Sequence, residues 1–181
     1  MSTDDDRPPI SRPLKVEQIR DGASGEIEAT PSEMADIARM LDLVELAALA
    51  FTYHLHHGAG GRLHMSGRLK AAVTQTCVVS LDPVEATLDV PVEVEFLPVS
   101  LIEELEQSVE ETGGSGLLDW PEPISGGKID LGPVIYETLA TALEPYPKRE
   151  GVSFDSSQGA PEVGAAGGTG PFAALAGLKR R

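Results

Sequence analysis

Apolar residues occupy every second position from Leu88 to Phe96, and the positions between them hold Asp89, Pro91, Glu93 and Glu95. Because successive side chains of a strand point to opposite faces of a sheet, this alternation predicts a strand with one face buried and the other in water. Such half-buried strands are typical of antiparallel sheets. Pro91 has no N–H to donate to a neighbouring strand, so we expect the strand near a sheet edge. The fold must therefore contain an antiparallel sheet that is covered on one face.

Two segments carry the signals of helices. Thr30 to Glu33 has the residues of a capping box with a proline in the first turn, which predicts a helix over residues 31–42. From Leu131 to Ala142, apolar residues recur at intervals of three and four, which predicts an amphipathic helix. Asp130 stands at the N-cap position of this second helix. We expect both helices to cover the apolar face of the sheet.

The remaining strands are less clearly marked. Ala47 to Ala50 favours a helix and Phe51 to Tyr53 favours a strand, and here we predict a strand. The further predicted strands cover about residues 14–19, 26–29, 47–56 and 63–81. We expect a break near Gly67 in the last of these strands. Aromatic residues are only 4% of the chain, so aliphatic side chains must fill the core. The predicted fold class is α+β: a curved antiparallel sheet, with an open barrel as a variant, packed with two or three helices.

The 181 residues are enough for one domain with a single core. We predict a disordered leader over residues 1–12, one domain over residues 13–150 and a flexible tail over residues 151–181, because both ends are rich in Gly or Pro. Within the domain, residues 98–128 have the composition of a mobile acidic insertion, with a helical turn at Leu101 to Leu105. No apolar run approaches the ~18 residues of a membrane span. The acidic start without an apolar core fits a cytoplasmic protein.

The net charge of −15 is distributed unevenly along the chain. Residues 71–127 hold 12 acidic residues and no Lys or Arg. Since nucleic-acid affinity comes largely from Lys and Arg that displace counterions, this segment by itself cannot form a phosphate-binding surface. It predicts either a solvated acidic surface or a face that binds a basic protein.

Four histidines are the residues closest to a metal site. His54, His56 and His57 lie close together, and His64 follows after a glycine-rich turn. Three imidazoles could bind zinc, but no carboxylate or thiolate stands at ligand spacing beside them. We therefore expect a polar strand end, and keep a metal-dependent hydrolase as the least favoured alternative.

Cys77 is the only cysteine, which excludes an internal disulfide. A nucleophilic thiolate with a histidine base is conceivable, but a lone cysteine in a β-rich run is more typical of a core residue. The paired acids of the insertion have no apolar pocket that would raise a pKa for acid or base catalysis. The sequence thus predicts a protein that is not an enzyme and has no cofactor.

Two features outside the regular elements are candidates for binding a partner. Trp120, the only tryptophan, precedes a stiff Pro-Glu-Pro turn, and the chain ends in three apolar residues spaced by three ahead of three cations. Such an apolar-basic end can dock as a helical peptide or contact phosphate. The full set of predicted partner-binding residues is Glu103, Glu104, Glu106, Glu110, Glu111, Trp120, Phe172, Leu175, Leu178, Lys179, Arg180 and Arg181.

Several separated motifs, taken in order, resemble the YceD family, whose members are described as large ribosomal subunit RNA accumulation proteins. They are Gln75 to Val84, Glu95-Phe96, Glu122 to Ile124, Ile129 to Gly132 with Glu137 and Leu139, Leu143 to Lys148, and Pro171 to Ala173 with Leu175 and Leu178-Lys179. The resemblance runs from about residue 14 to residue 181 and is nearest to the alphaproteobacterial branch. The motif residues that we expect to be structural are Cys77, Asp82, Pro83, Asp130, Leu131, Gly132, Glu137, Pro145, Tyr146 and Pro147.

The resemblance implies a cytoplasmic, non-catalytic protein that supports accumulation of 23S ribosomal RNA during assembly of the large subunit. The family is encoded in many bacteria beside a large-subunit ribosomal protein, so a basic ribosomal protein or a pre-large-subunit particle is the expected partner, and no membrane is expected. Some branches carry a second cysteine three residues after the position of Cys77. Ser80 stands there in this chain, so metal or redox chemistry of such a pair is not implied.

A direct RNA-binding module is the alternative. It would use Arg62, Arg68 and Lys70 together with Lys148, Arg149 and the terminal cations. RNA contact through these residues would depend steeply on salt. The acidic segment argues for the basic protein as the first choice, with residues 85–122 facing it and the last residues touching the pre-ribosome.

Overall fold

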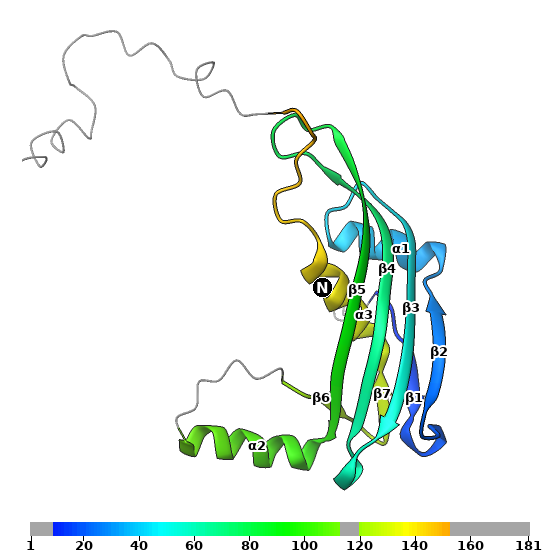
Figure 1. The fold of residues 1–181 in the computed structure, drawn as a ribbon, viewed down its shortest axis with the longest axis vertical. Coiled ribbons are helices and arrows are strands. Elements are labelled where there is room, and N and C mark those ends of the chain that lie inside the picture. The colour runs from blue at the N-terminus through cyan, green and yellow to red at the C-terminus, as the bar shows by residue number, and fades with distance from the viewer. Residues whose placement is uncertain (1–8, 113–119, 153–181) are drawn as a thin grey trace, which may run out of the picture. The chain divides into compact units, whose positions relative to one another are not determined.

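In the computed structural model, which describes residues 9–112 and 120–152, five strands form one curved sheet in the order β2-β3-β4-β5-β6 (Figure 1). Neighbouring strands are antiparallel except β5 and β6, which are parallel. The five strands are β2 (Ala23–Glu28), β3 (Glu45–His57), β4 (Leu63–Thr76), β5 (Pro83–Pro98) and β6 (Glu122–Ile124). A separate small sheet pairs β1 (Pro13–Lys15) with β7 (Lys128–Asp130).

The described residues also form three helices, α1 (Pro31–Met40), α2 (Val99–Thr112) and α3 (Leu131–Ala142), and two 3-10 turns at Val16–Gln18 and Ala59–Gly61. Buried residues of α1 and α3 join the same apolar core as the inner side chains of β3, β4 and β5. The large sheet is not closed on itself. The predicted α+β class, with a curved, mostly antiparallel sheet and helices packed against it, is confirmed.

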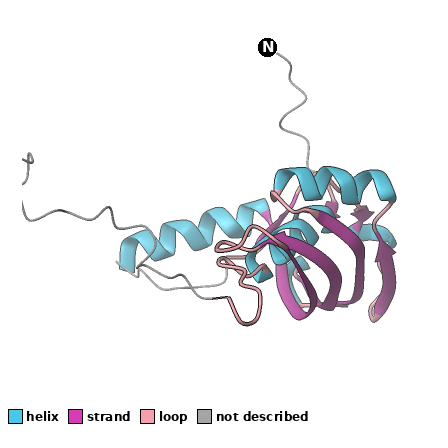
Figure 2. Ribbon diagram, turned by 90° about the horizontal axis from the view of Figure 1, so that it is seen from above, coloured by secondary structure: helices cyan, strands magenta, loops and turns pink. Residues whose placement is uncertain are grey.

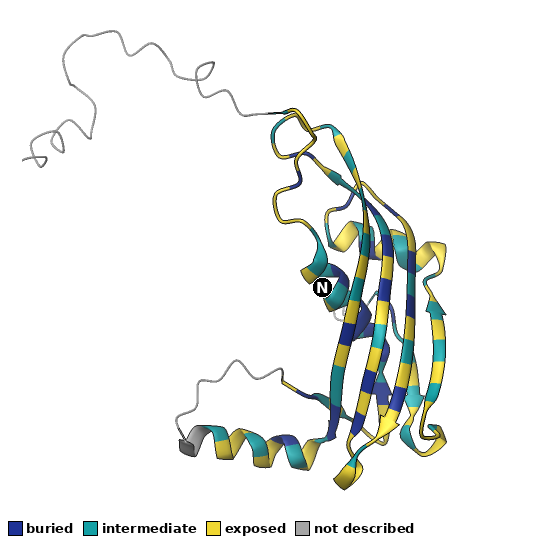
Figure 3. Cartoon of the chain, viewed as in Figure 1, coloured by how far each residue is buried: buried dark blue, intermediate teal, exposed yellow. Residues whose placement is uncertain are grey.

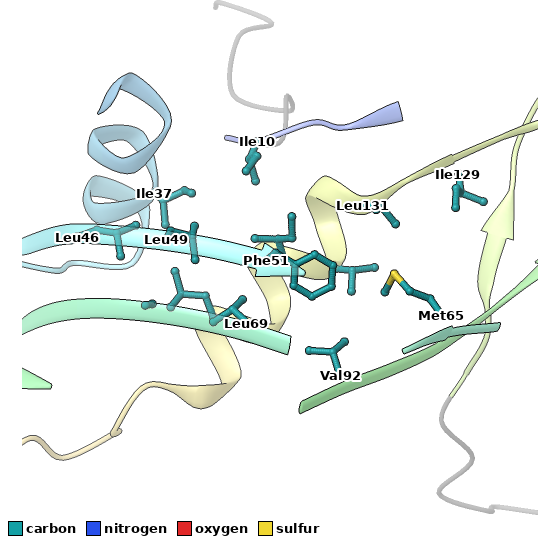
Figure 4. Packing of buried hydrophobic residues seen from close by; sticks show 14 of the residues in the cluster. Ile10, Ile37, Leu46, Leu49, Phe51, Met65, Leu69, Val92, Ile129 and Leu131 are labelled. Atoms are coloured by element: carbon teal, nitrogen blue, oxygen red, sulfur yellow. The ribbon is translucent and has the colours of Figure 1, made fainter. Parts of the chain in front are cut away.

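The alternation that predicted the central strands is visible in their burial (Figure 3). The core they cover is aliphatic, with Phe51 and Phe96 as the aromatic rings among the fully buried side chains of the described residues (Figure 4). The predicted break of β4 at Gly67 is wrong, because the strand continues through it. A Cβ at Gly67 would lie 2.8 Å from the Phe51 ring, so the glycine makes room for the ring.

The β4–β5 connection differs from the sequence prediction. We expected the β pattern to continue to residue 81, but β4 ends at Thr76 and a turn follows. The N–H of Cys77 donates to the Asp82 carbonyl and the N–H of Leu81 donates to the Cys77 carbonyl, which closes the turn. Leu81 has a φ of 62°, a left-handed conformation that a β-strand cannot accommodate. Residues with a high strand propensity, such as Val78 and Val79, therefore do not form a strand here, because the turn requires a left-handed conformation at Leu81.

Both predicted helix starts are confirmed. Thr30 accepts a hydrogen bond from the Glu33 N–H, and Glu33 accepts one from the Thr30 N–H, which is the reciprocal capping box. Asp130 caps α3 by accepting from the N–H of Gly132 at 2.9 Å.

The prediction of a single helical turn within an acidic insertion is wrong for its first half. Residues 99–112 form the 14-residue helix α2, and β6 and β7 lie in the second half. The physical reason is an apolar stripe, Leu101, Ile102, Leu105 and Val109, without a Gly or Pro among residues 99–112 to interrupt it. Residues 113–119 lie outside the described part of the chain.

The leader was also predicted to extend too far. Ile10 is 1% exposed and belongs to the core, close to Leu131 (Figure 4). The Arg12 guanidinium donates to both carboxylate oxygens of Glu33, at 2.6 and 2.8 Å. Residues 1–8 lie outside the described residues, but Ile10 to Arg12, which we assigned to the leader, are part of the fold. A lone isoleucine between prolines gave no periodic signal that could have indicated this.

The Arg12–Glu33 pair predicts a pH-dependent stability. The Arg12 hydrogen bonds lower the pKa of Glu33 to about 2. A lowered pKa means that the pair stabilises the fold above the ordinary glutamate pKa, and that this contribution is lost as the pH falls towards about 2. After allowance for solvent screening, we expect Glu33→Gln to lower the free energy of unfolding by about 1–2 kcal/mol at neutral pH. The difference from the unaltered protein should shrink as the pH falls.

Denaturant unfolding of the two proteins across the acid range measures this difference. Glu26→Gln, at an exposed position of β2, is the matched control and should change the stability by less than about 0.5 kcal/mol. A difference for Glu33→Gln that stays constant with pH would contradict the ion-pair explanation.

Candidate functional site

Most of the described side chains of the acidic helix α2 are exposed. It begins directly after β5, and its contacts with other elements are concentrated on β5 and β6 (Figures 1 and 2). Ile102, near the start of the helix, is buried, and Leu105 and Val109 further along are only half-buried. The helix therefore extends from the domain, and part of its apolar stripe is only half-buried.

The predicted acidic residues Glu103, Glu104 and Glu106 are all exposed. At 100° per residue, Glu103 and Glu104 point away from the apolar stripe, and Glu106, one turn after Ile102, lies at its border. Glu110 belongs to the same helix by position, as does Glu111, but the side chains of both lie outside the described set. The arrangement is an amphipathic helix with a carboxylate-rich face, which is suited to a basic partner and offers no enclosed site for chemistry.

Trp120 precedes β6 and is 44% exposed. The next strand holds Glu122, whose pKa is raised by partial burial and then by the charge of Glu137 on α3. Glu137, one of the predicted motif residues, therefore lies near the carboxylate of Glu122. Phe172, Leu175, Leu178, Lys179, Arg180 and Arg181 lie outside the described residues.

Three of the five described cations that a direct RNA-binding surface would use are paired with acids. Arg68 forms an ion pair with Asp89 across β4 and β5, and this hydrogen bond lowers the pKa of Asp89. The second pair joins Arg62 to Glu95 at 3.4 Å, and the third joins Arg149 to Asp82 at 3.0 Å. Paired cations contribute less to a phosphate-binding potential, so this geometry does not favour the RNA alternative.

The histidines are spread over the end of the sheet. His54 and His56 are exposed on one face of β3, as the strand alternation predicted, and His64 is the register partner of His56. His57 points elsewhere, with its ring 2.9 Å from the carbonyl oxygen of Ile19. Among the described residues no three His, Cys, Asp or Glu side chains are grouped closely enough to hold a metal ion.

Motif residues far apart in sequence meet at the tip of the β4–β5 hairpin. The Val78 N–H donates to the Pro147 carbonyl, and the Arg149 N–H donates to the Cys77 sulfur at 3.4 Å. Together with the Arg149–Asp82 pair, these bonds attach the segment after α3 to the turn. Three exposed apolar side chains lie in these two segments, Val78, Leu81 and Tyr146.

Cys77 is fully buried, but in a turn and not in the strand that we predicted. Hydrogen bonds from the Ser80 side chain and backbone, and then from the backbone N–H groups of Arg149 and Val79, lower the pKa of the thiol to about 6. Ser80, which stands where some family branches have a second cysteine, thus stabilises a thiolate. The buried sulfur accepts hydrogen bonds that hold two segments together, and it has no exposed surface for attack on a substrate.

The second group of motif residues lies at the start of α3. Asp130 accepts hydrogen bonds from the Arg12 N–H and the Ser11 hydroxyl, both at 2.6 Å, as well as from its own helix. Leu131 is fully buried, and its N–H donates to the Arg12 carbonyl. The partners of Asp130 in the N-terminal segment were missed by the sequence, because nothing local relates positions so far apart.

Two shallow hollows lie on the described surface. One, of about 460 Å³, is lined by residues of β3, β4 and β5, including Glu45, Glu85 and Thr87. The other, of about 550 Å³, lies between α1 and the start of β3. The charged residues that line the first hollow are Glu45 and Glu85, and those that line the second are Arg39 and Glu45. Neither set has the arrangement of a catalytic site.

No described helix is both long enough and apolar enough to cross a membrane. Neither the curated proteins nor the solved structures include a match to this chain. The model of one family does match: the description is Large ribosomal RNA subunit accumulation protein YceD, and residues 65–179, more than half of the chain, are covered. The matched range includes β5, α2, the hairpin tip and the start of α3. The chain therefore belongs to the YceD family, whose role lies in ribosome biogenesis and the accumulation of large-subunit ribosomal RNA.

Proposed function

We propose that this protein supports accumulation of 23S ribosomal RNA by binding and not by catalysis, and that the acidic face of α2 binds a basic ribosomal protein or a basic region of a pre-large-subunit particle. The observation that carries the proposal is the exposed row of Glu103, Glu104 and Glu106 on a helix that extends from the domain. The segment around them, residues 71–127, holds no cation that would neutralise them locally. The proposed compartment is the cytoplasm.

The magnitudes support a role in recruitment. An exposed ion pair contributes only about 0.2–1 kcal/mol, so no single carboxylate determines the affinity. Several carboxylates on one face raise the association rate with a basic protein, and a carboxylate surface repels the phosphates of RNA. The half-buried Leu105 and Val109 and the exposed Trp120 would add apolar contact area at the rim of this surface.

The terminal residues have a separate role in the proposal. Phe172, Leu175 and Leu178 with the three cations after them would contact the pre-ribosome, while α2 faces the basic partner. Opposite charges at the two sites suit a protein that connects a basic protein to an RNA-rich particle. The motif residues Cys77, Asp82, Pro83, Asp130, Leu131, Gly132, Glu137, Pro145, Tyr146 and Pro147 would build the fold that holds these sites.

The test replaces the five acids of α2 together, as Glu103→Gln, Glu104→Gln, Glu106→Gln, Glu110→Gln and Glu111→Gln. Glutamine keeps the helix propensity of glutamate, so α2 should persist. We expect co-sedimentation with pre-large subunits from cell extracts to fall about tenfold at low salt, with a matching fall in 23S ribosomal RNA in cells.

A matched control makes the same change in net charge away from α2, at five exposed acids: Glu17→Gln, Glu26→Gln, Glu28→Gln, Asp42→Asn and Glu150→Gln. This control should co-sediment nearly as well as the unaltered protein. Unaltered co-sedimentation of the α2 variant would sink the proposal. RNase treatment adds a second arm, because a complex that is lost after RNase would support direct RNA binding instead.

A further inference from the structure

One edge of β5 has no neighbouring strand over most of its length. β4 pairs with β5 from Pro83 to Phe96, whereas β6 pairs with it only from Phe96 to Pro98. Between Pro83 and Glu95, the described part of the chain places no strand on the other side. An unpaired edge presents a row of backbone N–H and C=O groups that can pair with another chain.

The register identifies which backbone groups face this open edge. The Cys77 N–H donates to the Asp82 carbonyl, so these two residues form a hydrogen-bonded pair of the antiparallel ladder. Hydrogen-bonded and non-hydrogen-bonded pairs alternate along such a ladder, and the register of β4 and β5 continues without a shift. The even-numbered residues of β5 therefore bond to β4. The odd-numbered residues direct their N–H and C=O groups to the open edge, namely Glu85, Thr87, Asp89, Pro91, Glu93 and Glu95.

Pro91 stands at one of the positions that face outward. Because Pro91 faces away from β4, its missing N–H removes no hydrogen bond between β4 and β5. The row of N–H donors along the open edge is interrupted at this position instead. The edge is thereby divided into a longer part from Pro83 to Asp89 and a short part at Glu93 to Glu95. A proline at such a position is a device by which proteins limit uncontrolled strand pairing.

The side chains beside the longer part have two different characters. On the core face, Ala86, Leu88 and Val90 are only half-buried, so an added strand could cover more of them. On the outer face, Glu85 is exposed and lines the hollow of about 460 Å³ together with Glu45. A strand that alternates apolar and basic residues would place its apolar side chains against the first face and its cations beside the second.

We propose that the open edge of β5 from Pro83 to Asp89 takes up an extended segment of a basic protein partner, with Lys or Arg on the outer face and apolar residues on the core face. This inference rests on the proposed function in the choice of a basic protein as the occupant. Asp89 is already paired with Arg68, so Glu85 is the acid that the outer face of this part of the edge offers to an added strand. A second copy of this chain would bring its own acidic β5 against Glu85, and like charges across neighbouring strands are destabilising. Charge complementarity thus selects a basic strand over self-association.

The test uses single substitutions that remove or add one N–H at the edge, with a control that keeps the N–H. Thr87→Pro removes an outward N–H in the way that Pro91 does naturally, and Thr87→Ala removes the side chain but keeps the N–H. Pro91→Thr adds the missing donor to the edge. The probe is a synthetic peptide of about ten residues in which Lys or Arg alternates with Val or Thr, compared with a scrambled peptide of the same composition.

We expect Thr87→Pro to weaken peptide binding about fivefold to tenfold, as loss of one backbone hydrogen bond would. Pro91→Thr should tighten it about fivefold, and Thr87→Ala should change it less than about twofold. Hydrogen exchange should show new protection at the amides of Glu85, Thr87 and Asp89 when the alternating peptide is bound. If Thr87→Pro fails to fold in a thermal melt, the exchange pattern of the unaltered protein decides the question, and absence of new protection at Glu85, Thr87 and Asp89 would then overturn the inference.

Equal dissociation constants for Thr87→Pro and the unaltered protein would overturn the inference, as would equal binding of the scrambled peptide. Protection on α2 without protection on β5 would also overturn it, but would leave the proposed function standing. Conversely, loss of co-sedimentation in the α2 variant has no bearing on the edge. Dimerisation without peptide that strengthens in Pro91→Thr would show that the occupant is a second copy, which contradicts the choice of partner.

Discussion

Gly132→Ala is expected to lower the free energy of unfolding by about 3 kcal/mol, which would be among the largest effects of adding a single methyl group to this domain. A Cβ at Gly132 would lie 2.7 Å from the Ile10 carbonyl carbon and 2.7 Å from the Ser11 Cα, with the Ile10 carbonyl oxygen nearer still. All of these atoms are backbone, so no side chain can rotate away. Either the N-terminal segment leaves α3 or the start of the helix shifts.

Gly58→Ala is the matched control, because it adds the same methyl group at another glycine with an ordinary backbone conformation. The nearest atom there belongs to the His64 ring, at 2.9 Å, and this side chain is 56% exposed and can move. We expect this control to change stability by less than about 0.5 kcal/mol in urea unfolding. A loss below about 1 kcal/mol for Gly132→Ala would show that the N-terminal segment is held less closely than the structure indicates.

Asp130→Ala should cost about 3 kcal/mol as well, for an electrostatic reason. One carboxylate accepts hydrogen bonds from the Gly132 N–H, the Arg12 N–H and the Ser11 hydroxyl, at 2.6 to 2.9 Å. Hydrogen bonds to a charged group contribute about 1.5–3 kcal/mol each, and three that share one carboxylate are not additive. The substitution removes the N-cap of α3 and leaves donors of the N-terminal segment without a partner.

Two comparisons separate the roles of Asp130. Thr30→Ala removes an N-cap that has no such second set of partners and should cost about 1 kcal/mol in the same urea unfolding measurement. Asp130→Asn keeps an acceptor oxygen but loses the charge and should fall between the two. Equal losses for Asp130→Ala and Thr30→Ala would mean that the contacts to Ser11 and Arg12 contribute little.

Asp130 and Gly132 belong to one of the motifs that supported the family resemblance, and the structure gives a physical reason for both residues. Asp130 holds the N-terminal segment by hydrogen bonds, and Gly132 lets that segment cross the helix at backbone contact. Ile10 can then enter the core beside Leu131. The motif therefore belongs to the construction of the fold.

Local patterns were sufficient for elements whose signals lie within a few residues. The alternation from Leu88 to Phe96 predicted β5, and the capping residues Thr30 and Asp130 predicted where α1 and α3 begin. For α2 the apolar stripe is present in the sequence and indicates a helix, whereas the acidic composition of the segment predicts a loop. The error shows that helical spacing of Leu101, Ile102 and Leu105 carried more information than charge did.

Contacts across long sequence separations could not be predicted in the same way. The ion pair of Arg12 with Glu33 and the bonds of the Cys77 sulfur to Arg149 depend on how the chain returns to itself. The open edge of β5 is of this kind too, since the sequence indicated an edge through Pro91 but not which neighbour was absent. Glu103, Glu104 and Glu106 were named from composition, and the exposure of α2 gives them a common face.

The sequence by itself determined the periodicity of the strands, the starts of two helices, the acidic character of residues 71–127 and the family resemblance, because each of these depends on the order of residues along the chain and not on contacts between distant segments. Only the tertiary structure decided that Ile10 is core, that the Cys77 sulfur joins two distant segments, and that one edge of β5 stays open. Those outcomes depend on which backbone groups and side chains come into contact after the whole chain has packed. Local helix and strand propensities contain no information about contacts between distant segments.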